Sequence, residues 1–153
     1  IKLKIVGRDW IDKNGNSFTE YLKTYINNDL KNNIELLGPV PHVEIPDYIE
    51  KAHVCVFPSH MEAMPIAWLE ALSMGKILIA GDIGPGREAI KNGVTGLLVN
   101  PFKINLLASV IIDVLNNVNS NVYGKAARKD IISRFNLDAT ITKNIEYYNK
   151  ILS

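Results

Sequence analysis

Short runs of aliphatic residues alternate with helical patterns along this chain, and each run ends at glycine or proline. Val54–Phe57 is followed by Pro58, and Ile77–Ala80 is followed by Gly81. Between them, Pro65–Met74 predicts an apolar helix with proline in its first turn, where a missing N–H costs no hydrogen bond. Strands that alternate with helices predict βαβ units and a parallel sheet. We therefore expect an α/β fold with strands buried on both faces.

The same alternation extends to both ends of the chain. Ile1–Val6 predicts a strand, and the spacing of apolar residues in Phe18–Leu30 predicts an amphipathic helix. From Ile104 to its end the chain is predicted to be helical, with breaks near Asn116–Asn121 and Asn136. The other expected elements are the strands Ile34–Leu37 and Gly96–Val99 and the helices Ile45–Ala52 and Arg87–Lys91.

The composition is typical of one soluble globular domain. The 153 residues are 47% hydrophobic and 22% charged, with a net charge of +1. Because no basic stripe is present, we expect no nucleic-acid partner. No apolar run approaches the roughly 20 residues of a membrane-spanning helix. Cys55 lies in an apolar run and is expected to be a buried thiol. Tyr21, Tyr25, Tyr147 and Tyr148 recur at helical spacing, which predicts core or half-buried positions.

Two carboxylates follow the strand Val54–Phe57, at the kind of strand end where open α/β sheets bind ligands. Glu62 lies in the loop, and Glu70 lies roughly 7 Å further along the axis of the next helix. Glu70 is the only charge between Ala63 and Gly75, so it needs partners or exposure. Vicinal ribose hydroxyls suit its two acceptor oxygens. The first N–H groups of the helix favour an anion such as a diphosphate.

A purely structural interpretation of these acids stays open. Acidic residues near helix starts are common caps, and a single glutamate on a helix is often only solvated. His60 lies close to Glu62 but is more typical of a loop histidine than of a catalytic one. No histidine has neighbours with metal-ligand spacing, so we expect no metal site. The turn Gly81–Gly86 lacks the spacing of a dinucleotide-binding fingerprint.

The segment Pro58–Gly75 resembles the E-x7-E signature of glycosyltransferase family 4, the glycosyl transferases group 1, whose two-domain architecture is called GT-B. Glu62 and Glu70 match the two glutamates of the signature. Flanking segments resemble the family in the same order, which makes the likeness specific, and it extends from Ile1 to about Tyr148. These segments are Leu36–Pro41, Ile45–Tyr48, Ile79–Ile90 and Asn92–Val99.

The resemblance implies a three-layer, Rossmann-like parallel sheet that forms one half of a GT-B enzyme. Residues 1–153 would be the C-terminal, nucleotide-sugar-binding domain of a longer protein. Because Ile1 already lies inside a strand-like run, we expect the first part of this domain and the N-terminal acceptor domain to be absent from this sequence. We also expect the isolated piece to be inactive.

By the same resemblance, Glu62 is the catalytic residue, whose carboxylate contacts the donor sugar, and Glu70 holds the ribose hydroxyls. The family's Arg and Lys that neutralise the diphosphate would lie upstream, which leaves Arg8 and Arg87 as nearby candidates. The other donor-binding residues implied are Met64, Pro65 and Ile66 against the diphosphate and sugar, Gly7 and Arg8 after the first strand, and Val40 against the nucleobase. Many members carry Gly-Phe-Gly where this chain has Ala63-Met64-Pro65, which we interpret as a variant of the motif.

The function implied is retaining transfer of a hexose from a UDP- or GDP-sugar to a glycan or lipid-linked acceptor, as in polysaccharide biosynthesis. No metal and no cofactor beyond the donor substrate are expected. The acceptor, and any peripheral membrane association, would involve the missing N-terminal half. Nucleotide-sugar use and the lack of a signal-peptide pattern predict a cytoplasmic protein. Two alternatives stay open: a UDP-sugar 2-epimerase-like enzyme, and a non-catalytic nucleotide-binding or interaction module of GT-B-like fold.

Overall fold

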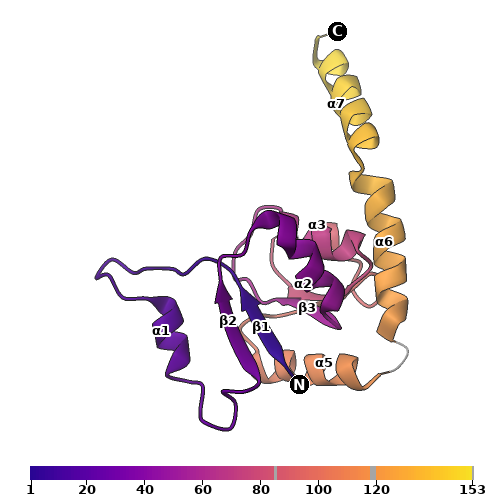
Figure 1. Ribbon diagram of the computed structural model, residues 1–153. Coiled ribbons are helices and arrows are strands. Elements are labelled where there is room, and N and C mark those ends of the chain that lie inside the picture. Colours follow the sequence, from indigo (N-terminus) through magenta and orange to yellow (C-terminus); the bar gives the residue numbers. More distant parts are fainter. Residues whose placement is uncertain (85, 118–119, 153) are drawn as a thin grey trace. The chain divides into compact units, whose positions relative to one another are not determined.

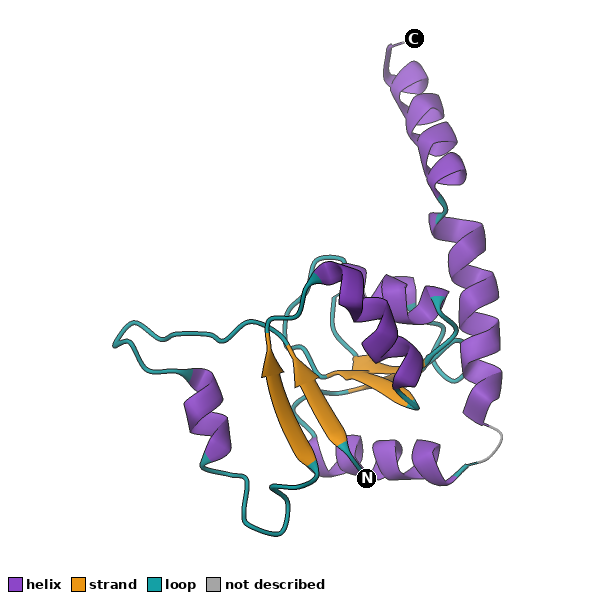
Figure 2. Ribbon diagram, in the orientation of Figure 1, coloured by secondary structure: helices purple, strands orange, loops and turns teal. Residues whose placement is uncertain are grey.

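The computed structural model describes residues 1–84, 86–117 and 120–152. The chain divides into two compact units, Ile1–Pro46 and Asp47–Ser153. Strands and helices alternate up to the consecutive helices at the C-terminal end, and the strand pairs of the described residues are parallel (Figures 1 and 2). The α/β class expected from the pattern of apolar runs is therefore confirmed.

Unit 1 contains one pair of parallel strands, β1 (Leu3–Val6) and β2 (Ile34–Gly38). Helix α1 (Phe18–Lys23) lies between them in the chain, and a 3-10 turn, η1 (His42–Glu44), follows β2. The side chain of Ser17 caps α1 by accepting a hydrogen bond from the N–H of Glu20 at 3.0 Å. This helix ends seven residues before the predicted Leu30, so the expected extent Phe18–Leu30 is wrong. Asparagines and short turns follow instead, as the low helix propensity of asparagine favours.

Unit 2 is built on a three-stranded parallel sheet. Its order is β3 (Val54–Phe57), β4 (Ile77–Gly81) and β5 (Leu97–Val99), with β4 in the centre. All five residues of β4 are buried, as the continuous apolar run predicts. Helix α2 (Ile45–Lys51) begins at the end of unit 1 and continues into unit 2. The helices that follow are α3 (Ile66–Ser73), α4 (Gly86–Ala89), α5 (Ile104–Asn116), α6 (Asn121–Phe135) and α7 (Leu137–Leu152).

Helices cover both faces of the unit 2 sheet, which gives three layers. On one face, Ile77 and Ile79 pack with Val99 and with Val114 of α5. Side chains alternate along a strand, so Leu78 lies on the other face. Figure 2 shows the strands between α5 on one side and α3 on the other. The fully buried residues of α3 supply much of this second layer: Trp68, Ala71 and Leu72.

The C-terminal helices break close to the expected positions. Helix α5 ends at Asn116, and Asn136 separates α6 from α7. Val118 and Asn119, within the first expected break, lie outside the described residues. Among the described residues, no helix has the length and apolar character needed to cross a membrane.

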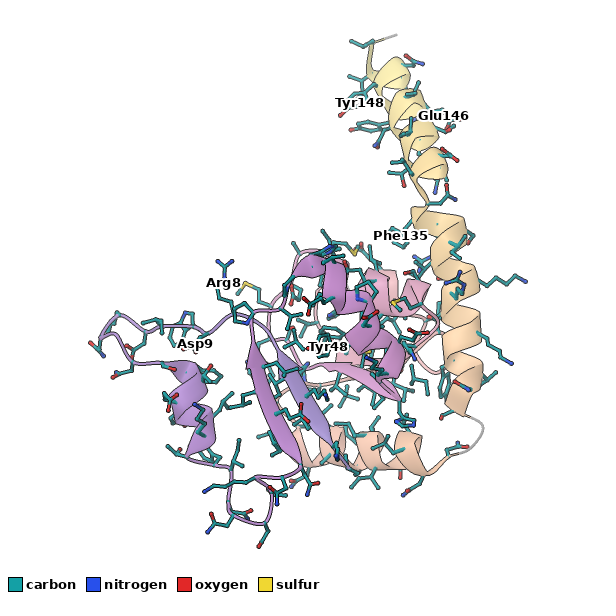
Figure 3. The ribbon with its side chains drawn as sticks, viewed as in Figure 1. Arg8, Asp9, Tyr48, Phe135, Glu146 and Tyr148 are labelled. Atoms are coloured by element: carbon teal, nitrogen blue, oxygen red, sulfur yellow. The ribbon has the colours of Figure 1, made fainter. Side chains whose placement is uncertain are left out.

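The prediction of core or half-buried tyrosines is wrong. Tyr21, Tyr25, Tyr147 and Tyr148 are between 53% and 67% exposed. Tyr21 of α1 contacts Tyr25 in the turn just after this helix, with ring centroids 5.1 Å apart, and Tyr148 lies on the exposed surface of α7 (Figure 3). Helical spacing shows that residues share a face, but it does not show that another element packs on that face.

Candidate functional site

The loop between β3 and α3, residues 58–65, carries Glu62 and leads directly into the start of α3. Helix α3 begins at Ile66 with Pro65 as its N-cap, one residue later than predicted. Within the described residues, no side chain caps this end of α3. The N–H groups of the first turn therefore point out of the helix, and with the helix dipole they favour a bound anion.

The backbone of this loop lies against the last residue of β4 and the turn that follows it. A Cβ atom built on Gly81 would lie 2.6 Å from the carbonyl oxygen of Ser59. A Cβ atom on Gly84 would lie 3.2 Å from the carbonyl oxygen of Glu62. Glycine at both positions lets the two segments approach this closely. Since β3 and β4 are parallel neighbours, their carboxyl ends bring the loop and the turn to one edge of the sheet.

Glu62 and Glu70 are both half-buried. Glu70 lies on α3 just before the buried residues Ala71 and Leu72, so its carboxylate is attached to a firmly packed helix. The Ser73 hydroxyl donates to the backbone carbonyl of Glu70 at 2.8 Å. The two acids therefore flank the start of α3, one in the loop before it and one on its second turn.

Unit 1 contains Gly7, Arg8 and Val40, and unit 2 contains the other predicted site residues. Gly7 donates its N–H to the carbonyl of Gly38 at 3.0 Å, which ties the end of β1 to the end of β2. Arg8 is exposed in the loop after β1, beside Asp9 (Figure 3). Val40 is half-buried two residues after β2.

Asp9 holds the loop of Arg8 in place. Its carboxylate accepts hydrogen bonds from the backbone N–H and the hydroxyl of Thr19, each at 2.8 Å. Hydrogen bonds from the Ser17 side chain and from the Thr19 N–H lower the pKa of Asp9 below its ordinary value. The sequence pattern does not single out this carboxylate, because its partners lie about ten residues away in α1.

Arg87 has a nearby acidic partner. Its Nε and Nη2 donate to the two carboxylate oxygens of Asp82 at 2.9 and 3.0 Å. The hydrogen bonds from Arg87 lower the pKa of Asp82, and the pairing raises the pKa of Arg87. To bind a phosphate through these nitrogens, Arg87 would have to give up this bidentate pair.

The ion pair forms part of the wall of a surface hollow. The hollow is lined by Asp82, Arg87, Ile90, Lys91, Asn92 and Leu98. Among the described residues, no group of three or more His, Cys, Asp or Glu side chains is arranged to hold a metal ion.

One aromatic contact of the Glu62 loop is not singled out by the sequence. The rings of His60 and Phe102 lie with their centroids 4.4 Å apart. Phe102 follows β5, so the contact depends on the sheet order β3-β4-β5, in which the loops after these strands share one edge. Nothing in the local pattern around Phe102 signals such a neighbour.

Comparisons with known proteins identify the family of this chain. Residues 1–130 match the family described as glycosyl transferases group 1. The chain is 30% identical over 113 residues to a glycogen synthase of Mycobacterium tuberculosis, a match that covers 73% of this chain and 27% of that protein. It is 28% identical over 172 residues to the UDP-Gal:alpha-D-GlcNAc-diphosphoundecaprenol alpha-1,3-galactosyltransferase of Escherichia coli, covering 94% of this chain and 44% of that protein.

Among solved structures, Alr3699/HepE of Anabaena in complex with UDP superposes with a TM-score of 0.88 at 20% identity. The match covers 98% of this chain and 41% of that one, and it shows the fold alone. The similar structures are GT-B glycosyltransferases, which confirms the fold implied by the resemblance. The chain spans less than half the length of these relatives.

Proposed function

The chain belongs to the glycosyl transferases group 1 family, and from this premise we propose that residues 1–153 form the C-terminal, donor-binding domain of a retaining glycosyltransferase. The intact protein would transfer a hexose from a UDP- or GDP-sugar to a glycan or lipid-linked acceptor. The acceptor would be bound by an N-terminal half outside this sequence. We propose that the reaction needs no metal and no cofactor besides the donor, and that it takes place in the cytoplasm.

The observation that carries this proposal is the arrangement of Glu62 and Glu70 around the start of α3. No side chain of the described residues caps this helix end, which lies at the carboxyl end of a parallel strand. A diphosphate there would receive hydrogen bonds from the first N–H groups of α3. Glu70 would accept from the ribose hydroxyls, and Glu62 from hydroxyls of the donor sugar.

This arrangement stabilises the charge that develops in glycosyl transfer. The bond between the anomeric carbon and the diphosphate oxygen breaks, and its electron pair leaves with the diphosphate. The acceptor hydroxyl oxygen bonds to the anomeric carbon and passes its proton to an oxygen of the departing diphosphate. Negative charge grows on the diphosphate in the transition state. The N–H donors at the start of α3 therefore interact more strongly with the diphosphate in the transition state than in the ground state, and this difference lowers the barrier. Glu62 and Glu70 would hold the donor in a reactive position.

The two arginines that could supply positive charge to the diphosphate differ in their surroundings. Arg8 is exposed after β1, whereas Arg87 is engaged by Asp82. We propose that Met64, Pro65 and Ile66 contact the diphosphate and sugar through their backbone, that Gly7 and Arg8 lie near the donor, and that Val40 meets the nucleobase. The name of the galactosyltransferase relative includes a UDP-sugar, which makes UDP the first nucleotide to test.

The test is calorimetric titration of the 153-residue chain with UDP and with GDP. We expect one nucleotide to bind, and Glu70→Ala to abolish that binding. Glu50→Ala is the matched control, because it removes an exposed carboxylate from α2, and it should bind as the parent does. Thermal unfolding of each variant shows that the fold is intact.

If neither nucleotide binds to the folded parent chain, the titration is repeated on a longer piece of the protein that extends upstream. Binding by the longer piece alone would show that upstream cations complete the site. Absence of binding in both would contradict a donor domain and favour a non-catalytic module of the same fold.

A further inference from the structure

The loop that carries Glu62 contributes one ring to an aromatic contact. The ring planes of His60 and Phe102 are inclined by 33°, with centroids 4.4 Å apart. His60 belongs to the loop 58–65, and Phe102 belongs to the turn between β5 and α5. Phe102 is 70% exposed, so burial in the core does not account for its position.

Phe102 lies in a turn whose backbone is ordered by hydrogen bonds and by the buried residue Pro101. Its N–H donates to the Asn100 side-chain oxygen at 2.9 Å, and the N–H of Lys103 donates to the Asn100 carbonyl at 3.0 Å. Pro101, between them, is buried, and its Cγ would lie 3.7 Å from a Cβ atom on Gly81. Local hydrogen bonds thus order the turn, and Pro101 packs close to the end of β4, so the His60 ring contacts a well-defined neighbour.

The backbone of the loop also lies against the end of β4 and the turn that follows it. There the carbonyls of Ser59 and Glu62 face Gly81 and Gly84. The loop therefore meets fixed structure at Ser59, at His60 and at Glu62. The His60 contact is the one made by a side chain, and it lies between the two backbone contacts.

We propose that Phe102 is a positioning residue for Glu62, acting through the ring of His60. Removal of the Phe102 ring would leave the fold intact but allow the loop 58–65 to move. The role rests on the proposed function, because it matters for the reaction only if Glu62 contacts the donor sugar. Phe102 itself need touch neither the sugar nor the nucleotide.

The first test is independent of any ligand. Hydrogen exchange of the backbone amides in residues 58–65 is compared in the parent chain, Phe102→Ala, His60→Ala and the double variant. Exchange should quicken about threefold to tenfold in each single variant, the range expected from loss of one aromatic pair, and no further in the double variant. Phe102→Tyr keeps the ring and should restore the parent rate.

Ile104→Ala is the matched control for this comparison. Ile104 is another apolar side chain close after β5, 74% exposed, and its removal should leave exchange in the loop unchanged. Unchanged exchange in Phe102→Ala would overturn the proposal, as would equal increases in Phe102→Ala and Ile104→Ala.

The second test measures the consequence for the donor. Affinities of the chain for UDP and for UDP-glucose are compared, or for GDP and GDP-mannose if GDP is the nucleotide that binds. Phe102→Ala should weaken binding of the nucleotide sugar several-fold and leave the nucleotide itself unaffected, and Phe102→Tyr should restore the parent ratio. Equal loss for both ligands, or no loss for either, would overturn positioning of Glu62. If the parent binds no nucleotide, the proposed function fails, and the exchange measurement still decides whether Phe102 holds the loop.

Discussion

Gly81 and Ser59 approach so closely that a Cβ atom on Gly81 would lie 2.6 Å from the Ser59 carbonyl oxygen. The obstacle is backbone and not the end of a flexible side chain, so a side chain at Gly81 forces one segment to move. Gly81 ends the fully buried strand β4, whereas Ser59 lies in the loop. The loop that carries Glu62 is therefore the segment that would shift.

Gly81→Ala should both destabilise the chain and displace this loop. Overpacking of this kind costs about 1–3 kcal/mol. The free energy of unfolding is measured with urea, and nucleotide-sugar affinity is measured in parallel and should fall. Gly93→Ala is the control, because Gly93 has a φ of 75° but no atom within 4 Å of its Cβ position. It should cost about 1 kcal/mol from backbone strain alone and leave binding unchanged. A Gly81→Ala variant as stable as the parent would contradict the close approach.

The local parts of this arrangement follow from the sequence. The strand Val54–Phe57 and the start of α3 agree with the prediction within a residue, because an apolar run closed by proline or glycine is a local signal. The contact of Gly81 with Ser59 could not be predicted in this way. It depends on which strands are neighbours in the sheet, and a single sequence does not record that order.

The same limit explains the missed side-chain partners. His60 and Phe102 are 42 positions apart in the chain and meet because β3, β4 and β5 end at one edge. The pairing of Arg87 with Asp82 spans five residues across a turn, a spacing outside the three- and four-residue neighbours of a helix. Without this geometry, Arg87 looks like a free cation for the diphosphate.

Glu62→Gln should weaken binding of the nucleotide sugar without weakening binding of the nucleotide alone. If Glu62 accepts hydrogen bonds from sugar hydroxyls, loss of its charge should weaken binding of UDP-glucose about tenfold or more, in line with hydrogen bonds to charged groups. Binding of UDP should stay within about twofold, because Glu70 and the start of α3 are unchanged. Both affinities are measured by calorimetry. Glu88→Gln removes an exposed charge from α4 as the control. A parallel loss of UDP binding would place Glu62 at the nucleotide instead.

Gly124→Ala tests the packing of α6 against the end of α3. A Cβ atom on Gly124 would overlap the carbonyl oxygen of Gly75, the residue with a φ of 71° that follows α3. Alanine gains about 1 kcal/mol in a helix interior, but here the overlap should outweigh this gain. We expect a net loss of about 1–3 kcal/mol in urea unfolding. Lys125→Ala, the next residue of α6 and exposed, should show no loss. A stabilised Gly124→Ala variant would show that the two helices can separate at no cost.

Asp130 links α6 to the end of α4 through two cations. Its side chain is 12% exposed and accepts hydrogen bonds from Lys91 at 2.6 Å and from the Arg134 Nε at 2.9 Å. Arg134 in turn donates to the backbone carbonyls of Glu88 and Ala89, at 2.7 and 3.0 Å. Burial alone would raise the pKa of Asp130, but the hydrogen bonds and charges of Lys91 and Arg134 outweigh burial and lower it below its ordinary value.

A carboxyl with a lowered pKa in the folded chain stabilises the fold above its unfolded pKa of about 4, and this contribution is lost as the pH falls through the folded pKa. Asp130→Asn should therefore cost about 1–2 kcal/mol at pH 7, since it also leaves Arg134 without its carboxylate partner. The difference from the parent should persist at pH 5 and shrink towards pH 3, as measured by urea unfolding at each pH. Asp113→Asn, an exposed acid on α5, should change stability little at any of these pH values. A difference between Asp130→Asn and the parent that grows on acidification would have the wrong sign for a carboxylate held by cations.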